Sequence, residues 1–280
     1  MSFVAIIGAG AIGGALAHKL AQRSRVADVR LIDPHATIAA GKALDILQAS
    51  PIESSSTAVT SSTSFAAAGG ASAIVVADPI DGGELAGENG LSVVRQLVRL
   101  DAAAPLLFAG ARQRELLMRA VRELHVDRRR VLGSAPYALE SAVRAVTAVM
   151  VDASPVDLSI GVYGVPPKSA VVAWQAATLT GRPLSSHLAP HHMAAISARV
   201  SSLWPLDAYA LASAAARVAE ALVDGSRRRF TCFAVLESTS AGRDVAAAVP
   251  VEIQRGGIRT IEEPALTRQE QTAFENALAR

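Results

Sequence analysis

The stretch FVAIIGAGAIGGAL, residues 3–16, decides the fold, because an apolar run ends there at a glycine turn that opens a helical pattern. Residues 3–7 show no alternation of polar and apolar side chains, as expected of a strand buried on both faces of a parallel sheet. Gly8, Gly10 and Gly13 follow with the spacing G-x-G-x-x-G. A strand, this turn and a helix in direct succession are typical of the first crossover of a dinucleotide-binding α/β fold.

Each glycine of this turn has a separate physical reason. Gly8 permits the tight turn, Gly10 lets the backbone approach a pyrophosphate without an intervening Cβ, and Gly13 allows the helix to pack closely on the strand. The amides of the first helical turn, including those of Ala11 and Ile12, then face the phosphates. The alternative is a turn of the same shape that holds no ligand.

An acidic residue stands where the ribose of a dinucleotide is expected. Asp33 follows the second apolar run, about twenty residues after Gly13. Its carboxylate can accept hydrogen bonds from ribose hydroxyls and would repel a 2′-phosphate. Because Pro34 and His35 follow it and no arginine does, the sequence predicts NAD as the cofactor rather than its phosphorylated form.

Short apolar runs alternate with helical patterns through the first half of the chain. The further strands expected there are residues 29–32, 74–77 and 106–109, and the helices are residues 12–22, 39–48, 91–100 and 114–125. In the second half, strands at 158–163, 171–174, 230–236 and 249–253 bracket a helical stretch at 193–223, and a helix at 268–279 closes the chain.

This order predicts two domains of different class. Residues 1–133 are expected to form an NAD-binding Rossmann domain, and residues 134–280 an α+β substrate-type domain. The fold class is therefore α/β, a Rossmann-type doubly wound parallel sheet followed by an α+β domain.

Composition excludes several classes of protein. The 280 residues, 51% hydrophobic and 19% charged, provide enough apolar side chains for buried cores and exclude disorder. The single cysteine, Cys232, cannot form an internal disulfide, so a cytoplasmic location is expected. The chain has no run of roughly 18 apolar residues, and a net charge of +2 gives little support to nucleic-acid binding.

The residues that follow the acidic position carry a family resemblance. Asp33-Pro34 and the run GKALDILQASPIE, residues 41–53, resemble the malate and lactate dehydrogenase family, and weaker similarity continues to residues 266–267. The resemblance implies NAD as cofactor, a small-molecule substrate, and a homodimer or homotetramer with the helix of residues 39–49 near a subunit contact. It does not by itself imply turnover.

That family uses a histidine as proton carrier, held by an acid, and this chain departs from the pattern. The run GVYG, residues 161–164, places Tyr163 where the family has its histidine, while Glu140 keeps the acid. A phenol with a pKa near ~10 is a poor base at neutral pH, but it can donate a proton in the reducing direction. The alternative for Tyr163 is a strand-end side chain bonded to backbone or water.

The arginine that binds the substrate carboxylate in that family is missing as well. Val143 stands at its position, and Arg144 lies one residue along, which turns a helical side chain by about 100°. Glu140 and Arg144 are four residues apart, so a surface ion pair is expected. A shift of the helix register would be needed to bring Arg144 to the substrate.

The segment from Asp78 to Glu84 corresponds to the family's mobile loop and is shortened. It carries acids, including Asp81, where arginines belong, and these would repel a dicarboxylate. Malate is therefore a poor fit unless Arg112 turns inward. Asp207 is expected to cap the helix that follows it rather than to face the cleft.

The remaining candidates are weaker. His191 and His192 are adjacent, so they face about 100° apart on a helix and do not share a metal easily, and no CxxC or HExxH pattern occurs. We therefore expect no metal site, although His191 remains an alternative base. The arginine runs 128–130 and 227–229 are expected on solvated loops.

Two functions remain open from the sequence. The first is an NAD-dependent oxidoreductase resembling malate or lactate dehydrogenase, with Tyr163 and Glu140 at the reaction centre. The second is a catalytically inactive relative that binds the dinucleotide and acts as a sensor or through its oligomer surface.

Overall fold

The computed structural model describes residues 2–101, 103–237 and 244–279. Its helices are α1 (Ala11–Arg23), α2 (Ala36–Ala49), α3 (Gly87–Leu100), α4 (Arg114–Arg122), α5 (Ala135–Met150), α6 (Pro190–Arg199), α7 (Ala208–Asp224) and α8 (Arg268–Leu278). Its strands are β1 (Phe3–Ile7), β2 (Asp28–Ile32), β3 (Ala58–Ser62), β4 (Ala73–Val76), β5 (Leu106–Phe108), β6 (Val131–Gly133), β7 (Leu158–Ser159), β8 (Val162–Val165), β9 (Ser169–Val172), β10 (Thr178–Leu179), β11 (Arg182–Pro183), β12 (Arg229–Leu236), β13 (Val245–Gln254) and β14 (Gly257–Ile261).

The first six strands form a parallel sheet in the order β3-β2-β1-β4-β5-β6. This is the order of the Rossmann fold, with the reversal point between β1 and β4, where open α/β sheets bind their ligands. All five residues of β1 and all four of β4 are buried, as their unbroken apolar runs predict. The predicted fold class is confirmed.

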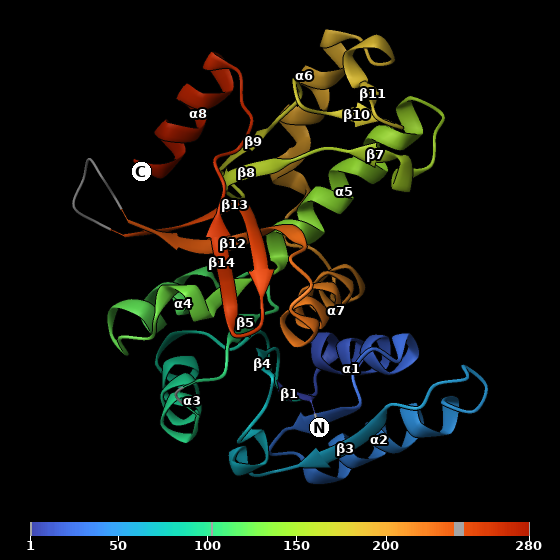
Figure 1. Cartoon of the computed structure of the whole chain (residues 1–280), viewed down its shortest axis with the longest axis vertical. Helices are drawn as coiled ribbons and strands as arrows, with labels where there is room; N and C mark the ends of the chain where they lie inside the picture. The colour runs from blue at the N-terminus through green and yellow to red at the C-terminus, as the bar shows by residue number, and fades with distance from the viewer. Residues whose placement is uncertain (1, 102, 238–243, 280) are drawn as a thin grey trace.

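The sheet continues into the second half of the chain through antiparallel strands. The edge strand β6 pairs with β12 at Gly133 and Phe233, and the order then runs β12-β13-β8-β9, with β14 also on β13. A separate small sheet has the order β11-β10-β7. Figure 1 shows β1 to β3 with α1 and α2 at one end of the molecule, α6 and α8 at the other, and β12 and β13 between them.

The structure differs from the expected elements in several places. Strand β3 was not predicted, and of its five residues only Val59 is buried, so it has little hydrophobic signal. The expected strand at 158–163 is divided into β7 and β8. The helical stretch at 193–223 is divided into α6 and α7 by a short 3₁₀ turn that ends at Leu203 and by Pro205.

The helices join the two halves of the chain along a buried face. Helix α1 packs on α7, and the Arg23 guanidinium of α1 donates two hydrogen bonds to the Glu220 carboxylate of α7, which is 1% exposed. One core cluster includes β1, β4, α7 and β12, so apolar packing is continuous across residue 133. The domain division at that residue remains a prediction. Among the described helices, none is long and apolar enough to cross a membrane.

Candidate active site

The glycine turn has the geometry that its sequence predicts. Gly8 has φ +98°, and a Cβ on it would lie 2.4 Å from the carbonyl oxygen of Asp78. A Cβ on Gly13 would lie 2.0 Å from the carbonyl oxygen of Gly8. The Gly8 amide donates to the Ile32 carbonyl at 2.8 Å, which ties the turn to the end of β2. The turn is thus closed between β1, β2 and α1.

The amides at the start of α1 are bonded to a side chain of the protein itself. Asp78, directly after Ala77 at the end of β4, is 7% exposed. Its carboxylate oxygens accept hydrogen bonds from the amides of Ala11 at 2.8 Å and of Ile12 and Gly13 at 2.9 Å each. Its carbonyl accepts from the Gly10 amide at 2.7 Å. A carboxylate at this place also complements the positive end of the helix dipole.

Asp33, the expected ribose ligand, is fully buried and is bonded within the protein. One carboxylate oxygen accepts from the amides of Ala9 at 2.9 Å and Ile80 at 3.0 Å. The other accepts from the His35 amide at 2.9 Å and lies 3.1 Å from His35 Nδ1. Burial opposes ionisation of Asp33, but these hydrogen bonds outweigh it and hold the pKa of Asp33 below its ordinary value.

The acidic segment 78–84 binds backbone instead of facing a substrate. Glu84 accepts hydrogen bonds from the amides of Ala111 at 3.0 Å and Arg112 at 2.5 Å. Burial raises the pKa of Glu84 in spite of these bonds. Asp81, which is largely exposed, lies 2.6 Å from His35 Nε2. The expectation that Asp78, Asp81 and Glu84 line a substrate pocket as repelling charges is therefore wrong for Asp78 and Glu84, which cap backbone amides.

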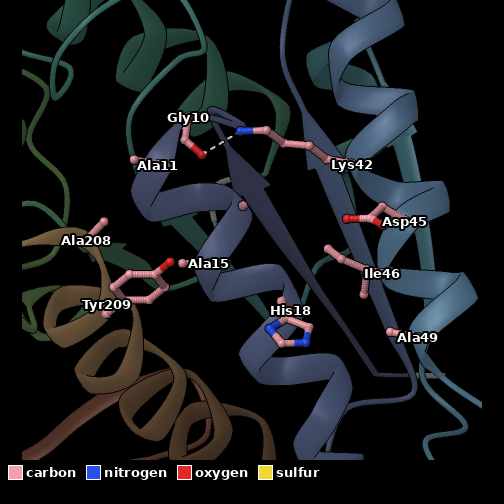
Figure 2. Close-up of a pocket in the computed structure, with 11 residues that line it drawn as sticks. Gly10, Ala11, Ala15, His18, Lys42, Asp45, Ile46, Ala49, Ala208 and Tyr209 are labelled. Carbon is pink, nitrogen blue, oxygen red and sulfur yellow. Dashed lines mark hydrogen bonds between the residues drawn. The ribbon is translucent and has the colours of Figure 1, made fainter. Parts of the chain in front are cut away.

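Lys42 supports the turn from α2, a role that the sequence reasoning missed. Its Nζ donates to the carbonyls of Ala9 at 2.6 Å and Gly10 at 3.0 Å, and Figure 2 shows the second of these bonds. The signal was available in the run GKALD, residues 41–45, which is part of the family resemblance. A hollow of about 470 Å³ lies beside the turn, between α1, α2 and the start of α7, with Asp45 and Tyr209 on its rim.

The residues present do not fit the pyrophosphate of a dinucleotide in this arrangement. The amides that would bind it are those of Ala11, Ile12 and Gly13, which already donate to Asp78. A Cβ on Gly10, at the point of closest approach for a phosphate, would lie 2.4 Å from Asp78 Oδ2. The side chain of Asp78 therefore lies where the phosphates would have to lie.

A second group of polar side chains lies at the junction of α5, β8 and β12. Glu140 accepts a hydrogen bond from Thr231 Oγ1 at 2.5 Å and lies 3.5 Å from Arg144 Nη2. The two side chains are 15% and 20% exposed, so the expected Glu140–Arg144 pair exists but is mostly buried, not on the surface. Desolvation raises the pKa of Glu140 although Thr231 and Arg144 oppose the shift.

Tyr163 of β8 is partly buried beside this group. Burial, with the charges of Glu140 and Glu262, raises its pKa to about 12. Its hydroxyl lies over Gly161, where a Cβ would come within 2.2 Å of it. A phenol with this pKa keeps its proton at neutral pH, so Tyr163 can donate a proton and cannot act as a ready base.

The structure provides no arginine clamp at the family's position. Val143 is fully buried in the core of the second half. The Arg144 guanidinium lies 5.8 Å from the ring centre of Tyr137 and turns toward Glu140, and Arg112 is exposed. The Arg144 guanidinium is thus directed at protein groups, the Glu140 carboxylate and the Tyr137 ring.

The other candidates lie outside this group or have structural roles. His191 and His192 are exposed in the first turn of α6 with ring centres 4.0 Å apart, and within the described ranges no three metal-binding side chains cluster. Asp207 occupies the N-cap position of α7, but its side chain makes no capping hydrogen bond, which corrects that expectation.

The arginine run 128–130 also differs from its expectation. It forms a short 3₁₀ helix instead of a solvated loop. The Arg130 guanidinium there donates to the carbonyls of Ala103 and Ala104.

Comparisons with known proteins agree with this architecture. Residues 3–81 match the model of the lactate/malate dehydrogenase NAD-binding domain. A malate dehydrogenase of Thermomicrobium roseum is 28% identical over 289 residues, which cover 97% of this chain and 93% of that protein. One of Dehalococcoides mccartyi is 26% identical over 279 residues, with 93% and 91% coverage.

Solved structures of the same kind superpose along nearly the whole chain. The lactate dehydrogenase of Cryptosporidium parvum, complexed with lactic acid and nicotinamide adenine dinucleotide, gives a TM-score of 0.88 at 21% identity, covering 99% of this chain and 95% of that one. The malate dehydrogenase of Salinibacter ruber gives 0.87 at 22% identity, with 99% and 94% coverage.

The strand order and the glycine turn define a Rossmann-type α/β protein of the dinucleotide-binding class. Within that class the chain is similar to the lactate and malate dehydrogenases, through the match of residues 3–81 to their NAD-binding domain and through malate dehydrogenases that align with nearly its whole length.

Proposed function

We propose that the chain is an NAD-dependent oxidoreductase that interconverts a small 2-hydroxy acid and its 2-keto acid. The observation that carries the proposal is the match of residues 3–81 to the NAD-binding domain of lactate and malate dehydrogenases. This match begins at β1, contains the glycine turn and Asp33, and belongs to a chain whose relatives over nearly its full length are malate dehydrogenases. On the cofactor side the proposed residues are Gly8, Gly10, Ala11, Ile12, Gly13 and Asp33.

The reaction centre is proposed to consist of Tyr163 and Glu140. Tyr163 retains its proton because burial and the nearby carboxylates raise its pKa to about 12. It therefore suits the reducing direction, in which the carbonyl oxygen of a keto acid gains negative charge and takes up a proton. Glu140, held by Thr231 and Arg144, is a positioning residue that fixes the electrostatic surroundings of the phenol.

The substrate class follows from the charged groups around the segment 78–84. Asp81 contributes a largely exposed carboxylate there, and the Arg144 guanidinium turns to Glu140. A second substrate carboxylate near this segment would meet an acidic group without a matching guanidinium. We therefore propose a 2-keto acid with one carboxylate in preference to oxaloacetate or malate.

A homodimer is proposed to form through α2. Exposed apolar side chains gather on this helix, with Ile38 at 48%, Leu44 at 56% and Leu47 at 40% exposure, and Tyr209 at the start of α7 is 83% exposed. Burying such side chains on association is favourable. A cytoplasmic location is also proposed, supported by a single cysteine that is buried and free.

Steady-state kinetics tests the proposed reaction. NADH oxidation is followed with a panel of 2-keto acids, and NAD reduction with the matching 2-hydroxy acids. We expect turnover of monocarboxylic substrates, and we expect Tyr163→Phe to lower kcat about 10²-fold. The control is Ser202→Ala, which removes a hydroxyl at an exposed position away from these groups. Absence of turnover with every substrate in both directions would overturn the proposal in favour of a catalytically inactive relative.

A further inference from the structure

The start of α1 binds an anion, and that anion is a side chain of the protein itself. Three consecutive amides, those of Ala11, Ile12 and Gly13, donate to the two oxygens of Asp78 at 2.8–2.9 Å. Amides at a helix N-terminus that follows a glycine turn are the groups that bind the pyrophosphate in dinucleotide-binding folds. A carboxylate offers them the same charge sign and the same kind of oxygen acceptors as a phosphate does.

Asp78 contacts the glycine turn through both its backbone carbonyl and its side chain. Its carbonyl accepts from the Gly10 amide at 2.7 Å, and its carboxylate would lie 2.4 Å from a Cβ on Gly10. Gly10 has no side chain, which leaves space for the approach of a phosphate. In this structure Asp78 occupies that space. Asp78 is 7% exposed, and its carboxylate accepts from all three amides, so in this conformation these donors are already paired.

Contacts further along hold the same segment across the edge of the sheet. The Ile80 amide donates to Asp33, the acid expected at the ribose, at 3.0 Å. Asp81 lies 2.6 Å from His35 Nε2 just after β2. Glu84 accepts from the Ala111 and Arg112 amides after β5. Together with the contact at the glycine turn after β1, these contacts hold the segment at the ends of β1, β2 and β5. This is the side on which parallel sheets bind ligands.

We propose that Asp78 is an internal competitor of the cofactor, whose carboxylate and the dinucleotide pyrophosphate bind the same amides in turn. The identity of the dinucleotide rests on the proposed function, while the competition for the amides rests on the contacts of Asp78 alone. The described conformation is the self-occupied state, and cofactor binds only to molecules in which Asp78 has left the turn. The apparent affinity is reduced by the fraction of molecules in that open state.

Equilibrium binding of ADP and of NAD, measured by calorimetry, tests the proposal without any need for turnover. ADP is the first probe because it carries a diphosphate on adenosine and cannot react. Asp78→Ala frees the three amides and removes a negative charge next to them. We expect it to bind both probes at least about tenfold more tightly than the wild type, which corresponds to about 1.4 kcal/mol. Equal affinity of wild type and variant would overturn the proposal.

The matched control is Asp45→Asn, which removes a negative charge from the exposed face of α2 near Lys42 without touching the amides of α1. We expect its affinity to stay within about twofold of the wild type. A gain equal to that of Asp78→Ala would show a general charge effect and overturn the proposal. Because Asp78→Ala also removes a helix cap, Asp78→Asn is the second variant. It keeps the shape but presents only one acceptor oxygen, so an intermediate gain is expected.

Hydrogen exchange on the wild type gives a second readout. If saturating NAD displaces the segment, the amides of Ile80 and Ala111 lose their carboxylate acceptors and exchange faster. Slower or unchanged exchange at both amides would contradict displacement.

The two proposals fail in different ways. If Asp78→Ala gains affinity for ADP but no form of the protein turns over, Asp78 is the competitor and the oxidoreductase proposal falls. If the protein turns over but Asp78→Ala leaves the affinity unchanged, the oxidoreductase proposal stands and the competitor falls. Failure of Asp78→Ala to bind either probe would also overturn the competitor, because freed amides would not then form an anion site.

Discussion

Gly10 and Gly41 differ in the space available for an added Cβ. The Gly→Ala substitutions at these two positions therefore form a matched pair that tests the close packing of the turn. A Cβ on Gly10 would lie 2.4 Å from Asp78 Oδ2 and 2.7 Å from the Asp78 carbonyl oxygen, whereas Gly41 in α2 has nothing within 4 Å. We expect Gly10→Ala to lower the free energy of unfolding by about 1–3 kcal/mol through overpacking. Gly41→Ala should raise it by about 0.5–1 kcal/mol, because alanine favours the helix. Urea unfolding of both variants measures the difference, and equal effects would contradict the close approach.

Glu140 gives the chain a predictable dependence of stability on pH. Its pKa in the folded state lies above the ordinary 4.5, mainly through desolvation, so the folded chain binds the proton more tightly than the unfolded chain. The stability associated with protonated Glu140 is therefore lost as pH rises through 4.5 toward the folded value. Glu140→Gln should flatten this decline and be at least as stable as the wild type at neutral pH.

The measurement for Glu140 is the melting temperature from about pH 4 to about pH 8. The control is Glu275→Gln on the exposed face of α8, which should leave the slope as it is in the wild type. An unchanged slope for Glu140→Gln would contradict the desolvation of this carboxylate in the folded chain.

The conformation or contacts of a residue could be predicted from the sequence where they are set by residues nearby in the chain. The conformation of Gly8 and the packing of Gly13 follow from spacing within the turn, and the Glu140–Arg144 contact follows from the four-residue helical repeat. The position of Asp78 does not follow, because its partners lie 65 to 67 residues earlier in the chain. A carboxylate that caps a distant helix has no signature in the local pattern.

At the scale of elements, a strand could be predicted where most of its residues are apolar and buried. β1 and β4 are buried on every residue and stand out as runs, while β3 buries only Val59 and does not. The division between β7 and β8 was also missed, because residues 158–163 alternate like one strand. The two strands belong to different sheets, because β7 pairs with β10 in the small sheet and β8 pairs with β13 and β9 in the large one.

The contact between α1 and α7 depends on one buried carboxylate. Glu220 is 1% exposed and accepts from the Arg23 guanidinium, which keeps 28% exposure. Removing Glu220 leaves Arg23 with partial access to water, so the cost of Glu220→Ala should be about 2–3 kcal/mol, below that of a fully enclosed pair. The exposed Glu53, bonded to Gln22 of the same helix, is the control, and Glu53→Ala should change stability by less than about 0.5 kcal/mol. Chemical denaturation distinguishes the two, and a comparable loss in both would refute the argument.

On the scale of the whole molecule, the apolar face of α2 predicts the oligomeric state. Leu44→Asp places a charge in the proposed contact and should weaken the dimer at least about tenfold, since a charge without a partner is costly to bury. Val149 on α5, which is 85% exposed, is the control, and Val149→Asp should leave association unchanged. Light scattering coupled to size exclusion gives the mass of each form. A wild-type monomer at all concentrations would remove the proposed contact.

The whole sheet also explains why the class of fold was predictable but the joint between its halves was not. The glycine turn after the first strand and the alternation of strands and helices indicate the class of fold, because neighbouring parallel strands need helical crossovers between them. The continuation into β12 depends on a single pairing of Gly133 with Phe233, a hundred residues apart, which no periodicity reveals.

Cys232 sits next to that joint, in the middle of β12 opposite Val249, with no exposed surface. Burial and the charge of Glu140 raise the pKa of its thiol, so a thiol-specific reagent finds neither access nor thiolate in the folded chain. Cys232 is the single cysteine of the sequence, so the chain gains a label only when the structure around β12 opens. The mass added over time thus measures how often the structure around β12 opens.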